Sequence, residues 1–137
     1  MTLLEALAGL VLQGSRRSAA APNYADKRTK EGAVLRAEVD DLLATADRAR
    51  ADGDLWNAAQ STELASQKLD AAGVIRRAIE LRRDAAATYT KFAESASPHA
   101  DVVAGYTRAA RAFLAAGDID AAKDFSDRAR GSDPAPR

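Results

Sequence analysis

Apolar residues recur every three or four positions along most of the chain, which is the period of one face of an α-helix. The first long stripe begins after Glu31 and consists of Val34, Leu35, Val39, Leu42, Leu43, Ala46 and Ala49. It ends at Gly53, a residue that takes the left-handed conformation of a helix C-terminus at little cost. A second stripe begins after Asp54, a good N-cap residue, and stops at Gly73. The pattern therefore predicts two helices that a short connection folds into an antiparallel hairpin.

Three further helices are predicted downstream. A long one covers residues 74 to 96 without an internal glycine or proline, and its apolar residues spread beyond one narrow stripe, so we expect neighbouring helices on two sides of it. Ser97 and Pro98 form an N-cap followed by a proline at the first helical position, which opens a fourth helix that ends at Gly117. Asp118 is the expected N-cap of a fifth helix. The sequence thus predicts an all-α protein of five antiparallel helices.

The start of the chain carries a separate amphipathic pattern. Its large aliphatic residues share one face of a short helix and are Leu3, Leu4, Leu7, Leu10 and Val11. The stretch is about half as long as a transmembrane helix, and its arginines follow the apolar residues instead of preceding them, unlike those of a secretory signal. A helix this short is only marginally stable alone, so we expect it to dock on its own bundle or on another subunit.

The composition divides the chain into four parts. Residues 1–13 form the N-terminal amphipathic helix, and residues 14–30, rich in basic side chains and interrupted by proline, form a flexible tether. Residues 31–130 form the helical domain, and residues 131–137 form a disordered tail. About a quarter of all residues are alanine, the strongest helix former, which favours helices packed closely through small side chains.

Charge and cysteine content exclude several classes of function. The 20 basic and 20 acidic residues cancel, so no overall field attracts nucleic acid or an anionic membrane. The absence of cysteine removes disulfides and thiolate chemistry and fits a cytoplasmic location. His99 is the single histidine and has no metal-ligand partner at a suitable spacing, and we find no phosphate-binding loop or serine elbow. We therefore expect neither an enzyme, nor a cofactor, nor a metal site.

One basic cluster could bind an anion. It consists of Arg76, Arg77, Arg82 and Arg83. Glu80 and Asp84 stand among these arginines at helical spacings, which favours an ion-paired, solvated face. We leave anion binding open as the alternative.

The last predicted hairpin has the spacing of a known repeat. Small and aromatic residues flank its turn in the order Tyr106, Ala109, Ala110, Phe113, Ala122, Ala129 and Pro134. This spacing resembles the tetratricopeptide repeat. A weaker copy without the aromatic residues surrounds Gly53, so that the resemblance covers residues 39–72 and 103–136. The long middle helix departs from the family because it replaces a second hairpin, and a five-helix bundle that shares only the hairpin chemistry is the alternative.

The resemblance implies a concave surface, lined by the first helix of each hairpin, that accepts a peptide or a helix of another protein. By the spacing of the family, the partner-binding residues would be Leu43, Asp47, Arg50, Thr107, Arg111 and Leu114. We accordingly expect a non-catalytic adaptor or scaffold, with no nucleic-acid partner and no membrane span. The alternative is a structural subunit that docks, or self-associates, through its N-terminal helix.

Two packing predictions complete the interpretation. Trp56 should pack near the first hairpin turn and not be fully exposed. Ala110 and Ala122 should face each other across the last hairpin, because small residues at these positions let two helices approach closely.

Overall fold

The computed structural model describes residues 30–96 and 98–132. It contains five helices in chain order: α1 (Lys30–Ala51), α2 (Leu55–Ala71), α3 (Ile75–Ser95), α4 (His99–Ala115) and α5 (Ile119–Ser132). These residues contain no strand, so the predicted all-α class and its five helices are confirmed. The predicted N-terminal helix, most of the tether and most of the tail lie outside the described residues.

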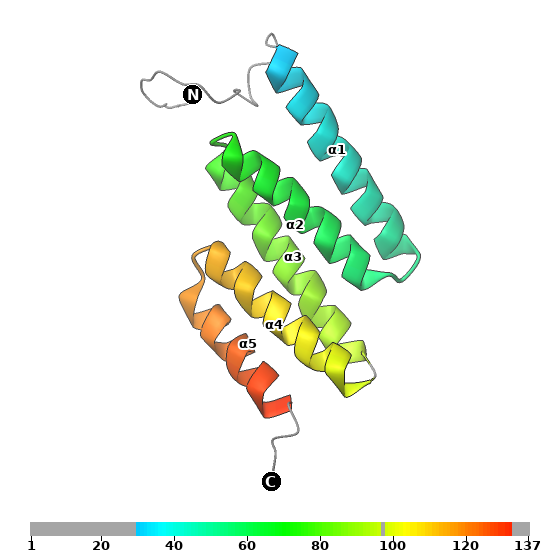
Figure 1. The fold of residues 1–137 in the computed structure, drawn as a ribbon, viewed down its shortest axis with the longest axis vertical. Coiled ribbons are helices and arrows are strands. Elements are labelled where there is room, and N and C mark those ends of the chain that lie inside the picture. The colour runs from blue at the N-terminus through cyan, green and yellow to red at the C-terminus, as the bar shows by residue number, and fades with distance from the viewer. Residues whose placement is uncertain (1–29, 97, 133–137) are drawn as a thin grey trace.

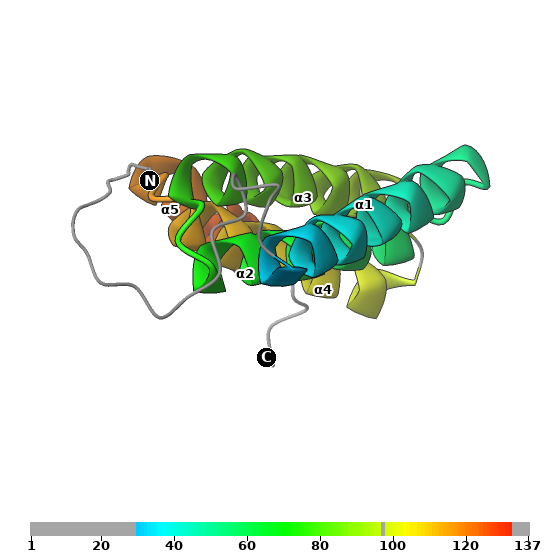
Figure 2. The ribbon, with the colours of Figure 1, turned by 90° about the horizontal axis from the view of Figure 1, so that it is seen from above.

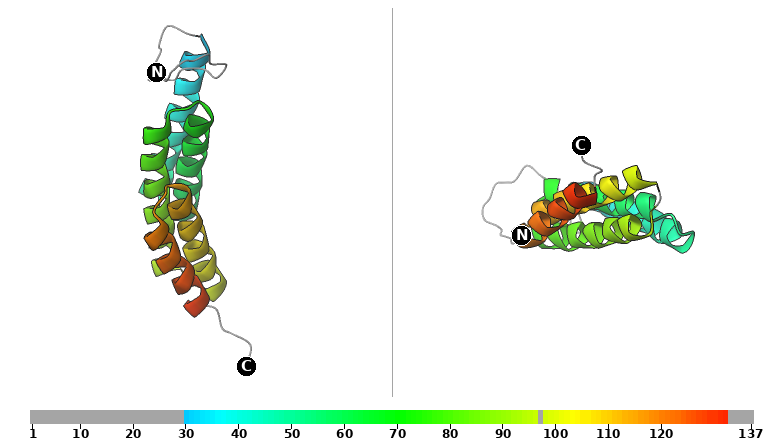
Figure 3. Two further views of the ribbon diagram at one scale, coloured as in Figure 1. Left: turned by 90° about the vertical axis from the view of Figure 1, so that its left-hand side faces the viewer. Right: turned by 90° about the horizontal axis from the view of Figure 1, so that it is seen from below.

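The helices form a flat array in which successive helices run antiparallel (Figure 1). Among the described residues, extensive helix packing is confined to consecutive pairs. The long helix α3 packs against both α2 and α4, as predicted. Seen from above, α3 lies along one side of the array, and α2 and α4 lie along the other (Figure 2). Seen on edge, the array is narrow and elongated, with α1 at one end and α5 at the other (Figure 3).

Three of the four turns have the same geometry. Each contains a glycine with positive φ, namely Gly53 at 80°, Gly73 at 82° and Gly117 at 87°. The residue after each glycine donates its backbone N–H to a carbonyl five positions earlier, at 2.8, 2.9 and 2.9 Å. This bond satisfies a carbonyl that the helix end leaves open. The three glycines were predicted as helix stops for this conformational reason.

The single long helix predicted in the middle of the chain is confirmed as α3, and it also pairs with α2 as a hairpin. The helices α2 and α3 pair through Gly73 as α4 and α5 pair through Gly117, and the two glycines stand 44 residues apart. Positions at this offset are buried or half-buried along both hairpins: Thr62, Ala65, Ser66, Leu69, Ala78, Leu81 and Ala85 correspond to Tyr106, Ala109, Ala110, Phe113, Ala122, Phe125 and Ala129. Residues 44 positions apart therefore occupy equivalent places in the two hairpins.

Two helix starts differ in how they are capped. The carboxylate of Asp54 accepts a hydrogen bond from the backbone N–H of Asn57 at 3.2 Å, which confirms it as an N-cap. At the start of α4, Pro98 itself is the N-cap residue, with φ −84° and ψ 177°, and it makes no side-chain cap. The prediction that placed the N-cap at Ser97 was therefore wrong by one residue, because proline fixes φ but its extended ψ keeps it outside the helix.

The interior is built mainly from alanine and lies in two clusters. The first joins α1, α2 and α3 and contains Val39, Ala65, Leu69, Ala78 and Leu81. The second contains residues of α2, α3 and α4, namely Ala59, Ala85, Tyr89 and Ala109. Trp56 of α2 and Phe125 of α5 pack against it. The Trp56 ring is half-buried and lies 5.3 Å from Tyr89 and 5.1 Å from Phe92, measured between ring centroids, so it packs as predicted. Ala110 and Ala122 are both buried.

Candidate protein-binding surface

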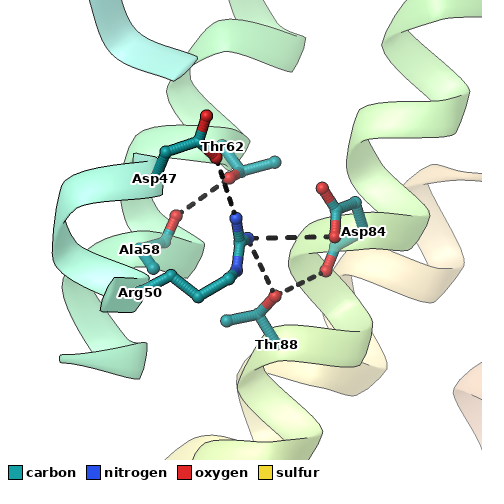
Figure 4. A network of polar contacts seen from close by, with 6 residues as sticks. All are labelled: Asp47, Arg50, Ala58, Thr62, Asp84 and Thr88. Carbon is teal, nitrogen blue, oxygen red and sulfur yellow. Dashed lines mark hydrogen bonds and ion pairs between the residues drawn. The ribbon is translucent and has the colours of Figure 1, made fainter. Parts of the chain in front are cut away.

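The three predicted partner-binding residues on α1 are engaged within the protein. Leu43 is half-buried and packs against the first core cluster. The Arg50 guanidinium donates to Asp47 Oδ1 and to Thr88 Oγ1, both at 3.3 Å (Figure 4). It also lies 3.9 Å from Asp84 Oδ1. Arg50 thus ties the end of α1 to α3, and Asp47 takes part in the same network.

The α1 and α4 residues do not come together in one groove. Between these two helices stand α2 and α3, and α1 has no extensive packing with α4 among the described residues (Figure 1). The helices α2 and α4 run in the same direction and contact each other through side chains. They are joined by Arg108 of α4, whose guanidinium lies 5.2 Å from the centre of the Trp56 ring and 4.0 Å from Glu63 Oε1.

Glu63 also accepts a hydrogen bond from the Tyr89 hydroxyl at 3.0 Å. Burial of Tyr89, followed by the negative charge of Glu63, raises the pKa of this phenol above its ordinary value. The phenol therefore stays protonated and holds the carboxylate where Arg108 reaches it. This contact between α2, α3 and α4 was missed from sequence, because nothing in the local pattern joins residues on three different helices.

The exposed side of α2 and α4 carries polar groups that are free to bind. Gln60, Leu64 and Gln67 of α2 lie on one helix face, and the 44-residue offset matches them to Ala104, Arg108 and Arg111 of α4. Gln67 and Arg111 are exposed, and their side chains make no hydrogen bond or ion pair with any residue that the structure describes. Leu64 beside them is 49% exposed. We call the surface made by Gln60, Leu64, Gln67, Arg108 and Arg111 the α2–α4 face.

The other predicted residues of α4 have a different position. Thr107 and Leu114 are exposed, and Leu114 keeps 57% of its surface open. At the same offset they match two residues of α2: Glu63, which faces Arg108 of α4, and Asp70, which pairs with Arg82 of α3. Arg82 also donates to the Ala115 carbonyl of α4. Thr107 and Leu114 therefore lie toward the outer edge of the array, and Arg111 belongs to the α2–α4 face.

The basic cluster of α3 is mostly paired. Arg77 contacts Glu80 at 3.1 Å, and Arg82, with only 17% of its side chain exposed, contacts Asp70 at 2.9 Å. Arg83 donates to both carboxylate oxygens of Asp118, at 2.8 and 3.0 Å. These hydrogen bonds hold the pKa of Asp118 below its usual range. Three of the four arginines are thus ion-paired, as predicted, but Arg82 and Arg83 pair with Asp70 and Asp118 and not with Glu80 or Asp84.

Neither a group of potential metal ligands nor a membrane-spanning helix is found among the described residues. His99 is exposed at the start of α4, and no group of three or more potential metal ligands occurs in the part of the chain that the structure describes. Within the same residues, none of the helices combines the length and apolar character needed to cross a membrane. No protein-family model, curated protein or solved structure matches the chain.

Proposed function

We propose that this protein is a non-catalytic protein–protein interaction module, an adaptor or scaffold that binds a peptide or helix of a partner across the α2–α4 face. One observation carries the proposal: Gln67 and Arg111, at equivalent positions on two adjacent parallel helices, are exposed and lack partners among the described residues. Polar side chains displayed in this way can bond to an incoming chain without first breaking an internal bond.

The chemistry of the face indicates what it would recognise. Arg111 offers a free guanidinium, and Arg108 beside it is held by Glu63 only at the long distance of 4.0 Å. Gln60 and Gln67 offer amide donors and acceptors, and Leu64 offers an apolar contact. A peptide or helix that carries a carboxylate and a neighbouring apolar side chain fits this set, because guanidinium binds carboxylate through paired hydrogen bonds.

The resemblance to tetratricopeptide repeats supports the same function, since repeat arrays of this kind bind peptides along adjacent parallel helices. The absence of cysteine supports a cytoplasmic location for this activity. The alternative, a structural subunit held by its N-terminal segment, is favoured by the aliphatic stripe at Leu3, Leu4, Leu7, Leu10 and Val11.

Site-specific photo-crosslinking tests the proposal. A benzophenone amino acid placed at Gln67 or at Arg111 should capture a partner in cells that produce the protein, whereas the same group at Ala44, exposed on α1, should not. Titration calorimetry with the purified partner then measures affinity. Arg111→Glu should weaken binding by about tenfold or more, since a buried charged contact commonly contributes at least 1.4 kcal/mol.

A second charge reversal provides the matched control. Arg76→Glu changes an exposed arginine at the start of α3, away from the face, and should leave the affinity unchanged. Equal affinities for the two variants would show that the partner binds elsewhere and would overturn the assignment to the α2–α4 face.

A further inference from the structure

The 44-residue offset shows which side of the array is left open. On the α2/α3 hairpin, α4 covers one edge: Ala59 is buried beside Ala109, and Glu63 faces Arg108. On α3, Arg82 donates to the Ala115 carbonyl of α4 at 3.4 Å. The equivalent positions on the α4/α5 hairpin have no helix of the described chain over them.

We name these equivalent positions the open edge. Val103, Thr107 and Leu114 of α4 match Ala59, Glu63 and Asp70, and Ser126 of α5 matches Arg82. Thr107 is exposed, and Leu114 is 57% exposed. Nearby, at the start of α5, Ile119 is 61% exposed, so the α4–α5 turn carries the two most exposed large hydrophobic side chains of the described residues.

We propose that residues 2–13 of the same chain dock on the open edge and continue the array as its sixth helix. The first argument is spacing. Three buried residues of α4, Gly105, Ala109 and Ala112, are spaced at positions i, i+4 and i+7. The N-terminal segment has Leu3, Leu7 and Leu10 at the same spacing.

The second argument is that the leucines of the N-terminal segment and the side chains of the open edge are complementary in size. The small buried residues of α4 pack against the α2/α3 hairpin, which carries the large rings of Trp56 and Tyr89. At the open edge, Val103, Thr107 and Ser126 are small or medium in size, and Leu114 adds one large exposed apolar side chain. Leucines fill the space that small side chains leave, and their burial removes a large apolar stripe from water.

The connection is long enough to reach the edge. Because successive helices run antiparallel, the start of α1 and the α4–α5 turn lie at the same end of the helices (Figure 1). The path passes α1, α2 and α4, and at 8–10 Å per helix it is roughly 30 Å long. Residues 14–29 span up to about 50 Å when extended. A tether of this length gives the N-terminal segment an effective concentration in the millimolar range at the open edge of its own molecule. Docking within one molecule is therefore favoured over docking between two molecules.

Thiol crosslinking tests the docking in the full-length chain. The protein has no cysteine, so introduced thiols are unique. A Leu7→Cys/Thr107→Cys variant treated with a short bismaleimide should yield an intramolecular crosslink about tenfold faster than a Leu7→Cys/Ala44→Cys control, which places the second thiol on the outer side of α1. Equal rates would show that the segment is not held at the edge. Crosslinked dimers in place of monomers at micromolar protein would show that a second copy supplies the segment, and would overturn docking within one molecule.

A charge at the edge provides an independent readout that needs no crosslinker. Leu114→Asp should release the segment and speed tryptic cleavage after Arg16 and Arg17 about fivefold or more, because local opening governs proteolysis. Ile75→Asp alters a similarly exposed apolar residue at the start of α3, outside both the open edge and the α2–α4 face, and should leave the cleavage rate unchanged. If both variants were cleaved at the wild-type rate while circular dichroism showed both to be folded, the proposal would fail, even if the α2–α4 face still bound its partner.

Discussion

The contact between α3 and α4 at Gly105 makes a sharp prediction. A Cβ atom added there would lie 2.7 Å from the Cβ of Ala93 and 3.0 Å from its Cα, and would also meet Cδ2 of Phe92 at 3.0 Å. Carbon atoms pack best at about 3.5–4.0 Å, so the two helices would have to separate by roughly 1 Å. Such overpacking costs about 1–3 kcal/mol. Alanine recovers up to about 1 kcal/mol because it is the better helix former, so Gly105→Ala should destabilise the protein by about 0–2 kcal/mol.

Gly131 provides the matched control. It lies in α5, and an added Cβ there meets nothing within 4 Å. Gly131→Ala should therefore gain a fraction of the same helix propensity without any steric cost. With a gain of about 0.5 kcal/mol at Gly131, the free energies of unfolding of the two variants should differ by about 0.5–2.5 kcal/mol, which corresponds to several degrees in Tm for a domain of this size.

Urea unfolding followed by far-ultraviolet circular dichroism measures this difference. Fluorescence of Trp56 reports on the same region, because its ring contacts Phe92. A double variant, Ala93→Gly with Gly105→Ala, moves the Cβ from one helix to the other and should recover part of the loss, as a double-mutant cycle would reveal. If Gly105→Ala proved as stable as Gly131→Ala, the close approach of α3 and α4 would be refuted.

Three further predictions concern single side chains. Tyr89→Phe removes the hydrogen bond to Glu63 and should cost about 1–2 kcal/mol near neutral pH. The pKa of Tyr89 is higher in the folded state than in the unfolded chain, where it is about 10. The contribution of Tyr89 to the free energy of unfolding is therefore complete below about pH 10 and is lost as the pH rises above that value. Urea titrations should show a steeper alkaline loss of stability for wild type than for Tyr89→Phe. Ala122→Leu should overpack a site that is 8% exposed and lower the free energy of unfolding by about 1–3 kcal/mol, and an unchanged melting temperature would argue against its contact with Ala110. Gly73→Ala forces a side chain into φ +82° and should cost about 1 kcal/mol by the same assay, although no atom obstructs it.

The helices and their ends could be predicted because their signals are local. Gly53, Gly73 and Gly117 stop helices through a backbone conformation that depends on the glycine itself. The repeat spacing was not recognised in the α2/α3 hairpin because its residues differ from those of the last hairpin. Val74 stands where the other two turns have aspartate, and Thr62 stands where the last hairpin has Tyr106.

The candidate surface was less predictable because it depends on how each helix is rotated against its neighbours. Periodicity identifies the apolar face of α1 but not the partner of Arg50, which is Thr88, 38 positions later. The family spacing paired α1 with α4, whereas the structure places α2 beside α4. Arg111, one of the residues expected to bind a partner, is exposed, and Gln67 was not among them because the repeat spacing was not recognised in the middle hairpin.

The restriction of helix packing to consecutive pairs has a consequence for local unfolding. An end helix that packs extensively on one neighbour can detach while the remaining helices keep most of their contacts, whereas α3 cannot open without exposing both α2 and α4. In an array of this kind, stability is close to a sum of terms for each helix and each interface. Amide hydrogens of α5 should therefore exchange with solvent through small openings, and those of α3 only through events close to global unfolding. The molecule is thus most easily altered at its ends, which is where added or deleted helices would disturb it least.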